Sequence, residues 1–129
     1  MQDGSYLIRV PVSGASVICP VQPPVTEKLL AEMLGTDVTE RMRMPAAAQR
    51  GGGSVLCYFI DARGGEKNLP VNFRGTCFYH TGCPIHGDLL IARCPQNAAD
   101  PSIYGLAPEQ AEEIVMWISE QFPDLNDMI

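Results

Sequence analysis

The sequence predicts an α+β fold in which two helices pack on a mainly antiparallel sheet. Apolar residues alternate with polar residues over several short segments, a pattern typical of strands with one buried face. Two other segments repeat apolar residues at helical spacing, as helices packed on a core do. The strands come in runs instead of alternating one by one with helices, which favours antiparallel pairing. We expect the order β-β-α-β-β-β-β-α.

The 129 residues are expected to form a single domain, with a core over residues 6–122 and a short acidic tail over 123–129. Hydrophobic residues make up 46% of the chain and charged residues 19%, which is ordinary for a globular domain. No apolar run reaches the roughly 18 residues that a membrane helix needs, and the first residues lack a signal-peptide pattern. The sequence therefore predicts a soluble cytoplasmic protein that acts on no membrane.

The first third of the chain predicts a strand pair followed by a helix. Residues 6–12 and 16–21 alternate as strands do, and Pro11 puts the first of them at a sheet edge or ends it there. Thr26 is a suitable N-cap for the helix, and Gly35 supplies its left-handed end. The apolar stripe of this helix consists of Leu29, Leu30, Met33 and Leu34, with Val25 and Leu30 placed as a hydrophobic staple.

The middle of the chain predicts further strands over residues 38–44, 54–60, 68–73 and 76–80, and residues 88–94 follow after a connection that contains Gly and Pro. In the first of these, Met42 and Met44 point to one face, and Arg41 and Arg43 point to the other. The second is nearly all apolar, so we expect it to be buried on both faces.

The last helix is expected over residues 108–122. Pro108 is favoured at the first helical position, and Pro123 ends the helix. Its apolar face consists of Ala111, Ile114, Val115, Ile118 and Phe122. The glutamates of the helix are left to solvent.

Negative charge is concentrated at the C-terminal end of the chain. The formal net charge is −6, yet residues 94–129 contain seven acids and no Lys or Arg. A general nucleic-acid binder is expected to be basic, so we expect no direct nucleic-acid partner. Two explanations remain open. The acids form a solvated helix face that aids solubility, or Glu112, Glu113 and Glu120 dock a basic surface on a protein partner.

Cysteine and histidine residues cluster over residues 77–94. The five cysteines are an odd number, which argues against a secreted disulfide framework and for reduced thiols. Cys77, His80, Cys83 and His86 recur every third position and are the residue types that zinc prefers, although the spacing matches no standard zinc finger. The alternative is that Cys77 and Cys94 are core residues and the other three lie in a loop. We expect no cofactor, with zinc as the alternative.

A Cys–His nucleophilic pair is the corresponding enzyme hypothesis. Cys57, Cys77 or Cys83 could meet His80 or His86 in space, but none of them carries a recognisable local signature. Cys57 lies in an apolar run, where we expect an inert thiol. The sequence therefore indicates no catalytic residue.

Arginines recur on or beside the predicted strands and suggest an anion site. Guanidinium groups match phosphate and carboxylate groups, so several arginines on one sheet face would suit an anionic ligand. The candidate ligand-binding residues are Arg41, Arg43, Arg74, Asn72 and Arg93. The other explanation is that these arginines pair with the acidic last helix or lie in solvent.

Several short motifs resemble a known family. They are Met33-Leu34-Gly35 before a strand with Glu40, Asn68-Leu69-Pro70-Val71-Asn72, Gly87-Asp88-Leu89-Leu90-Ile91, and Tyr104 to Gln110 opening the last helix. Over residues 6–122 this layout resembles the domain-of-unknown-function family 3846, small proteins found mostly in phages, prophages and plasmids. The chain departs from the family in having Ala107 where a Ser or Thr cap is expected, and in the Cys/His-rich loop at 77–86. The family offers no catalytic residues to carry over.

The resemblance implies a non-enzymatic accessory protein of a phage or mobile element, located in the host cytoplasm. We expect it to act by binding an unidentified protein partner, for example by inhibiting a host defence factor. One alternative is a binder or sponge for an anionic, nucleotide-like ligand that uses the strand arginines. Another is a zinc protein or a Cys/His enzyme built on residues 77–94. The sequence leaves a homo-oligomer open.

Overall fold

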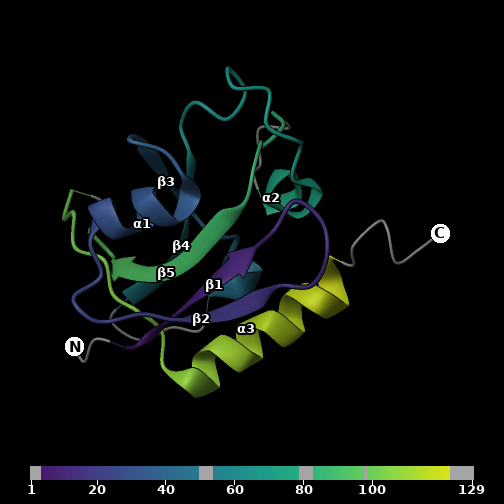
Figure 1. The fold of residues 1–129 in the computed structure, drawn as a ribbon. Coiled ribbons are helices and arrows are strands. Elements are labelled where there is room, and N and C mark those ends of the chain that lie inside the picture. The colour runs from purple at the N-terminus through teal and green to yellow at the C-terminus, as the bar shows by residue number, and fades with distance from the viewer. Residues whose placement is uncertain (1–3, 50–53, 79–82, 98, 123–129) are drawn as a thin grey trace.

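The computed structural model describes residues 4–49, 54–78, 83–97 and 99–122. Its centre is one five-stranded antiparallel sheet with the strand order β2-β1-β5-β4-β3 (Figure 1). The strands are β1 (Tyr6–Val10), β2 (Val17–Pro20), β3 (Thr39–Arg43), β4 (Ser54–Asp61) and β5 (Leu89–Pro95). The helices are α1 (Glu27–Leu34), α2 (Phe73–Phe78) and α3 (Pro108–Gln121), with a 3-10 turn η1 (Ala46–Ala48) before β4. The predicted α+β class with an antiparallel sheet is confirmed.

The elements between β4 and β5 differ from the prediction. The two strands predicted over 68–73 and 76–80 are wrong. In the described residues, the chain before Phe73 is a turn and a loop with a single bridge between Val71 and His86, and residues 73–78 form helix α2. Asn72 begins the helix, since its side-chain oxygen accepts the backbone N–H of Gly75 at 3.0 Å. A short apolar run does not distinguish a strand from one and a half helical turns. Over the described ranges the observed order is therefore β-β-α-β-β-α-β-α, with three α-helices.

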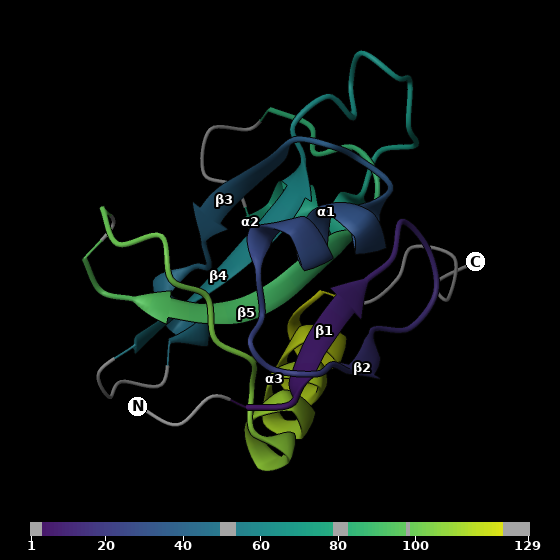
Figure 2. The same cartoon turned by 60° about the vertical axis from the view of Figure 1, so that its left-hand side comes forward.

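Helix α3 closes one face of the sheet, opposite α1 (Figure 2). Its predicted apolar stripe lies in the core, with Ala111, Ile114 and Ile118 buried. Phe78 of α2 extends this core and stacks on Trp117, with ring centroids 6.4 Å apart. In the described parts of the chain, no helix is both long enough and apolar enough to cross a membrane.

Helix α1 packs on the opposite face. The predicted cap residues are confirmed, because Thr26 Oγ1 accepts the N–H of Leu29 at 3.1 Å and Gly35 adopts φ 70°. Val25 and Leu30 are buried in a second core with residues of β1, β4 and β5. This helix has only eight residues, so it spans about 12 Å. It therefore covers only part of its face.

Strand β3 lies at one end of the sheet order and carries the two arginines that the alternation singled out. Arg41 lies opposite Phe59 of β4, and Arg43 lies opposite Cys57. Residues directly opposite each other share a face, so both arginines lie on the α1 side of the sheet. Met44 is buried on the α3 side, as the alternation predicts.

Candidate functional site

A groove runs along β3 on the α1 side of the sheet. Three adjoining cavities of about 180, 300 and 420 Å³ form it. Arg41 lines the first two cavities, and Arg43 lines the second and third. We call these three cavities together the β3 groove. It lies beside the short helix α1, which covers only part of β3 and β4.

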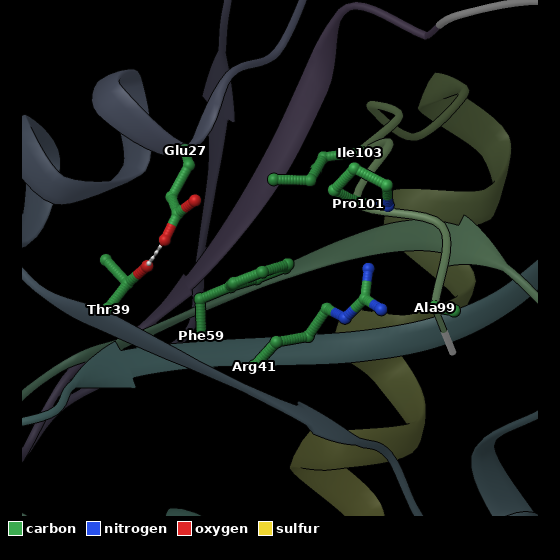
Figure 3. A pocket seen from close by; sticks show the side chains of 7 residues that line it. All are labelled: Glu27, Thr39, Arg41, Phe59, Ala99, Pro101 and Ile103. Atoms are coloured by element: carbon green, nitrogen blue, oxygen red, sulfur yellow. Dashed lines mark hydrogen bonds between the residues drawn. The ribbon is translucent and has the colours of Figure 1, made fainter. Parts of the chain in front are cut away.

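Arg41 reaches across the sheet toward the segment that follows β5. Figure 3 shows its guanidinium directed at the side of the cavity formed by Ala99, Pro101 and Ile103. Arg41 Nη1 donates a hydrogen bond to the carbonyl oxygen of Asp100 at 3.1 Å. This contact holds a half-buried guanidinium in place at the junction of the first two cavities.

The two ends of the β3 groove differ in charge. At the α1 end, Glu27 lines the cavity and accepts a hydrogen bond from Thr39 Oγ1 at 3.2 Å. The other two cavities are lined by Arg41, Arg43, Gln49, Gln96 and apolar groups, with no Asp or Glu among their described lining residues. The end that holds Arg43 is therefore the one suited to an anion.

Gln49 closes that end of the groove and fixes its shape. Its Nε2 donates to the carbonyl oxygens of Met44 and Leu56, both at 3.1 Å. Its Oε1 accepts the N–H of Leu56 at 2.8 Å. The Gln49 side chain thus makes hydrogen bonds with Leu56 of β4 where β3 has ended. These bonds hold the turn that follows β3. Gln49 is not predicted from the sequence, because no local pattern marks this role.

Two buried cysteines lie on β4 and β5, on the face of the sheet that carries Arg43. Cys57 of β4 lies opposite Ala92 of β5, and Cys94 lies two positions further along β5, so both are on the α1 face. The Cys94 thiol, by hydrogen bonding, lowers the pKa of Cys57, and the charges of Arg41 and Arg43 lower it further, against the effect of burial. The same hydrogen bond, burial and the charge of Cys57 raise the pKa of Cys94, against the charge and hydrogen bond of Arg41, which lower it. The expectation of an inert Cys57 did not include the arginines on the neighbouring strand, and it stays a prediction.

The other three predicted anion ligands lie outside the β3 groove. Asn72 is fully buried, and its Nδ2 donates to the carbonyl oxygens of Val10 and Gly87, both at 3.0 Å. Arg74 is 6% exposed and donates to Ser16 Oγ and to a backbone carbonyl of the turn after β1.

Arg93 is also engaged elsewhere. Its Nε donates to the carbonyl oxygen of Gly105 at 2.8 Å, and its guanidinium lies 6.0 Å from the ring centre of Tyr104. Of the five candidate ligand residues, the structure thus brings together only Arg41 and Arg43.

The structure describes three of the four predicted zinc ligands. Cys77 and Cys83 are exposed, and His86 Nδ1 lies 2.8 Å from the carbonyl oxygen of Leu69. His80 lies outside the described residues. Within the described ranges, no three His, Cys, Asp or Glu side chains converge on one point that could hold a metal ion. Zinc binding by this loop stays a prediction.

The predicted partner-binding glutamates lie along the outer face of α3. Glu112, Glu113 and Glu120 are exposed, whereas the opposite side of the helix is buried. Met116 adds an apolar side chain to the outer face and is 62% exposed. This surface is thus acidic with one apolar residue near its centre.

Comparison of the chain with protein-family models, with curated proteins and with solved structures found no match. The resemblance to the domain-of-unknown-function family therefore stays a prediction. The geometry of the β3 groove and of α3 is what supports any functional assignment.

Proposed function

We propose that this chain acts by binding, and that the β3 groove takes a small anionic ligand of nucleotide-like chemistry. The observation that carries the proposal is the placement of Arg41 and Arg43. They lie two positions apart on the last strand of the sheet order, and both line the same groove. Two guanidinium groups at one site favour a group with several anionic oxygens, such as phosphate.

The size and lining of the β3 groove support a ligand larger than phosphate itself. Its two larger cavities have volumes of about 300 and 420 Å³, in the range of small-molecule sites. Val55 lines both cavities, and Phe59 lines the first one beside Arg41. These apolar side chains would contact a base or another flat group while the arginines hold the anionic end.

Thermal unfolding with a series of nucleotides tests this proposal. Adenosine mono- and diphosphate should raise the unfolding midpoint, whereas adenosine should not. A ligand at 100 times its dissociation constant stabilises the folded state by about 2.7 kcal/mol, which is readily measured. The shift should be lost in Arg43→Gln and kept in Arg63→Gln, an exposed arginine in the turn after β4. Equal shifts in the two variants would show that the ligand binds elsewhere.

A second candidate is a protein partner that docks on α3. The observation that favours it is the exposed acidic face of this helix around Met116. An accessory role in a phage or mobile element, such as inhibition of a host defence factor, would use this surface. A Glu112→Gln/Glu120→Gln variant should lose such a partner and should bind more weakly at high salt, because exposed charges are screened. Glu66→Gln, on the exposed turn after β4, is the matched control.

A further inference from the structure

The β3 groove contains a nucleophile as well as two cations. Cys57 lines the same 300 Å³ cavity as Arg41 and Arg43. The residue is only 5% exposed, so the cavity is the route by which a reagent reaches its sulfur. A thiol that lines a cavity together with two arginines differs from a thiol packed in a closed core.

The charged and titratable side chains that act on Cys57 come from the neighbouring strands. Arg41 and Arg43 face it from β3, and the Cys94 thiol faces it from β5. On the α1 side, Glu27 lines only the neighbouring cavity. Both cations and the thiol donor favour the thiolate form of Cys57, which is the nucleophilic form.

Cys94 is placed to donate to Cys57 and not to form a disulfide with it. The register puts Ala92 directly opposite Cys57 and puts Val55 directly opposite Cys94, so the two cysteines are diagonal neighbours. Diagonal neighbours in an antiparallel pair have Cα atoms about 7–8 Å apart, whereas a disulfide needs about 4.4–6.8 Å. Cys94 is 1% exposed, so it is also closed to reagents.

We propose that Cys57 is a reactive thiol of the β3 groove that forms a mixed disulfide with small anionic disulfides, of which oxidised glutathione is the type. Cys94 is its positioning residue. Arg41 and Arg43 bind the carboxylates of the incoming molecule. The preference for an anionic reagent rests on the proposed function of the groove, but the reactivity of Cys57 does not.

The reaction is an exchange between a thiolate and a disulfide. The Cys57 thiol first loses its proton to water. Its sulfur then attacks one sulfur of oxidised glutathione, so that a new S–S bond forms as the glutathione S–S bond breaks. The Cys57 sulfur is oxidised, and the departing glutathione sulfur is reduced to a thiolate that takes a proton from water. Excess glutathione thiol reverses the reaction.

Peptide mass mapping after timed exposure of the native full-length chain tests the proposal. The reagents are oxidised glutathione, the neutral 2-hydroxyethyl disulfide and the cationic cystamine. The exposed Cys77 serves as the internal reference, because the rate ratio of Cys57 to Cys77 cancels the intrinsic reactivity of each reagent. We expect this ratio to be about tenfold higher for glutathione than for cystamine, the change that one pKa unit or one charge contact produces.

Variants show whether the two arginines and Cys94 act on the reaction of Cys57 or only on the folding of the chain. Arg43→Gln should lower the glutathione ratio about threefold to tenfold, and Arg63→Gln should leave it unchanged. Cys94→Ala should move the pH midpoint of the Cys57 reaction upward, and Cys94→Ser should restore it because a hydroxyl also donates. The unfolding midpoint of each variant shows that it is folded.

Two results would overturn the proposal. One is an unmodified Cys57 in the folded chain while Cys77 reacts, and the other is the same ratio for glutathione and cystamine. Nucleotide binding by Cys57→Ser, which keeps both arginines, tests the proposed function separately. If that variant binds nucleotide and Cys57 does not react, only the thiol proposal fails. If Cys57 reacts with glutathione and no nucleotide binds, only the nucleotide assignment fails.

Discussion

The two faces of the sheet are covered to different extents. On one face the 14-residue α3 and the aromatic side chains around Phe78 close the core. On the other face the eight-residue α1 packs against part of β4 and β3, and the β3 groove remains. Each face holds a buried core, and the core on the closed face is the larger one. The partly covered face exposes the residues that can meet a ligand, and the arginines of β3 point to that face.

The largest expected effect on stability comes from a smaller side chain in the core under α3. Ile118→Ala removes buried methylene groups from the core under α3 and should lower the free energy of unfolding by about 2–4 kcal/mol. Urea unfolding followed by the fluorescence of Trp117 measures this loss. Met116→Ala, on the exposed side of the same helix, should change stability by less than about 0.5 kcal/mol. Equal unfolding midpoints for the two variants would mean that α3 does not close the sheet.

Asn72 should behave as part of the fold and not as part of the ligand site. Asn72→Ala leaves the carbonyl oxygens of Val10 and Gly87 without their donor and removes the cap of α2, at a cost of about 2–3 kcal/mol. Asn97→Ala removes one exposed contact with the N–H of Ala99 and should cost less than about 1 kcal/mol. If Asn72→Ala kept full stability and lost ligand binding, Asn72 would belong to the site.

Asp61, the last residue of β4, makes the stability of the fold depend on pH. Burial raises the pKa of Asp61, but hydrogen bonds from Lys67, from the N–H of Arg63 and from Thr36 lower it more, so its pKa lies below the ordinary value. A lowered pKa in the folded state contributes stability above the unfolded pKa of about 4, and this stability is lost as the pH falls through the folded pKa.

Asp61→Asn should therefore flatten the decline of the unfolding free energy below about pH 4. Asp37→Asn, an exposed change in the loop before β3, is the control and should keep the decline of the parent chain. If both variants declined as the parent chain does, the ion pair of Asp61 and Lys67 would contribute nothing to stability.

The smallest effect on stability is expected in the β3 groove itself. Arg43→Gln should change the free energy of unfolding by less than about 0.5 kcal/mol, because Arg43 is exposed. A loss of more than about 2 kcal/mol would show that Arg43 is part of the core and would contradict the assignment of the groove as a ligand site.

Local sequence patterns predicted the elements that depend on interactions between residues close together in the sequence. Thr26 and Gly35 bound α1, and β1 ends at Val10, directly before Pro11, because caps and a missing N–H act within a few residues. The buried stripe of α3 and the split of β3 into methionines and arginines also follow from their periods.

Local patterns were insufficient where distant residues decide the structure. Helix α2 depends on the buried Asn72, whose bonds reach Val10 and Gly87. Gly75 lies so close to β5 that an added Cβ would be 2.9 Å from Leu89 Cδ2. The β3 groove likewise depends on the register that places Arg43 opposite Cys57. This register is not encoded within a window of a few residues.

Mapping backbone amide shifts by NMR while adding adenosine monophosphate tests the difference between the two faces most directly. We expect saturable shifts in β3, in β4 around Cys57 and in the described residues that follow β5, with α3 unchanged. The shifts should be absent in Arg41→Gln/Arg43→Gln and present in Arg63→Gln. Shifts confined to α3, or no saturable shifts at the β3 groove, would contradict the assignment of ligand binding to the partly covered face.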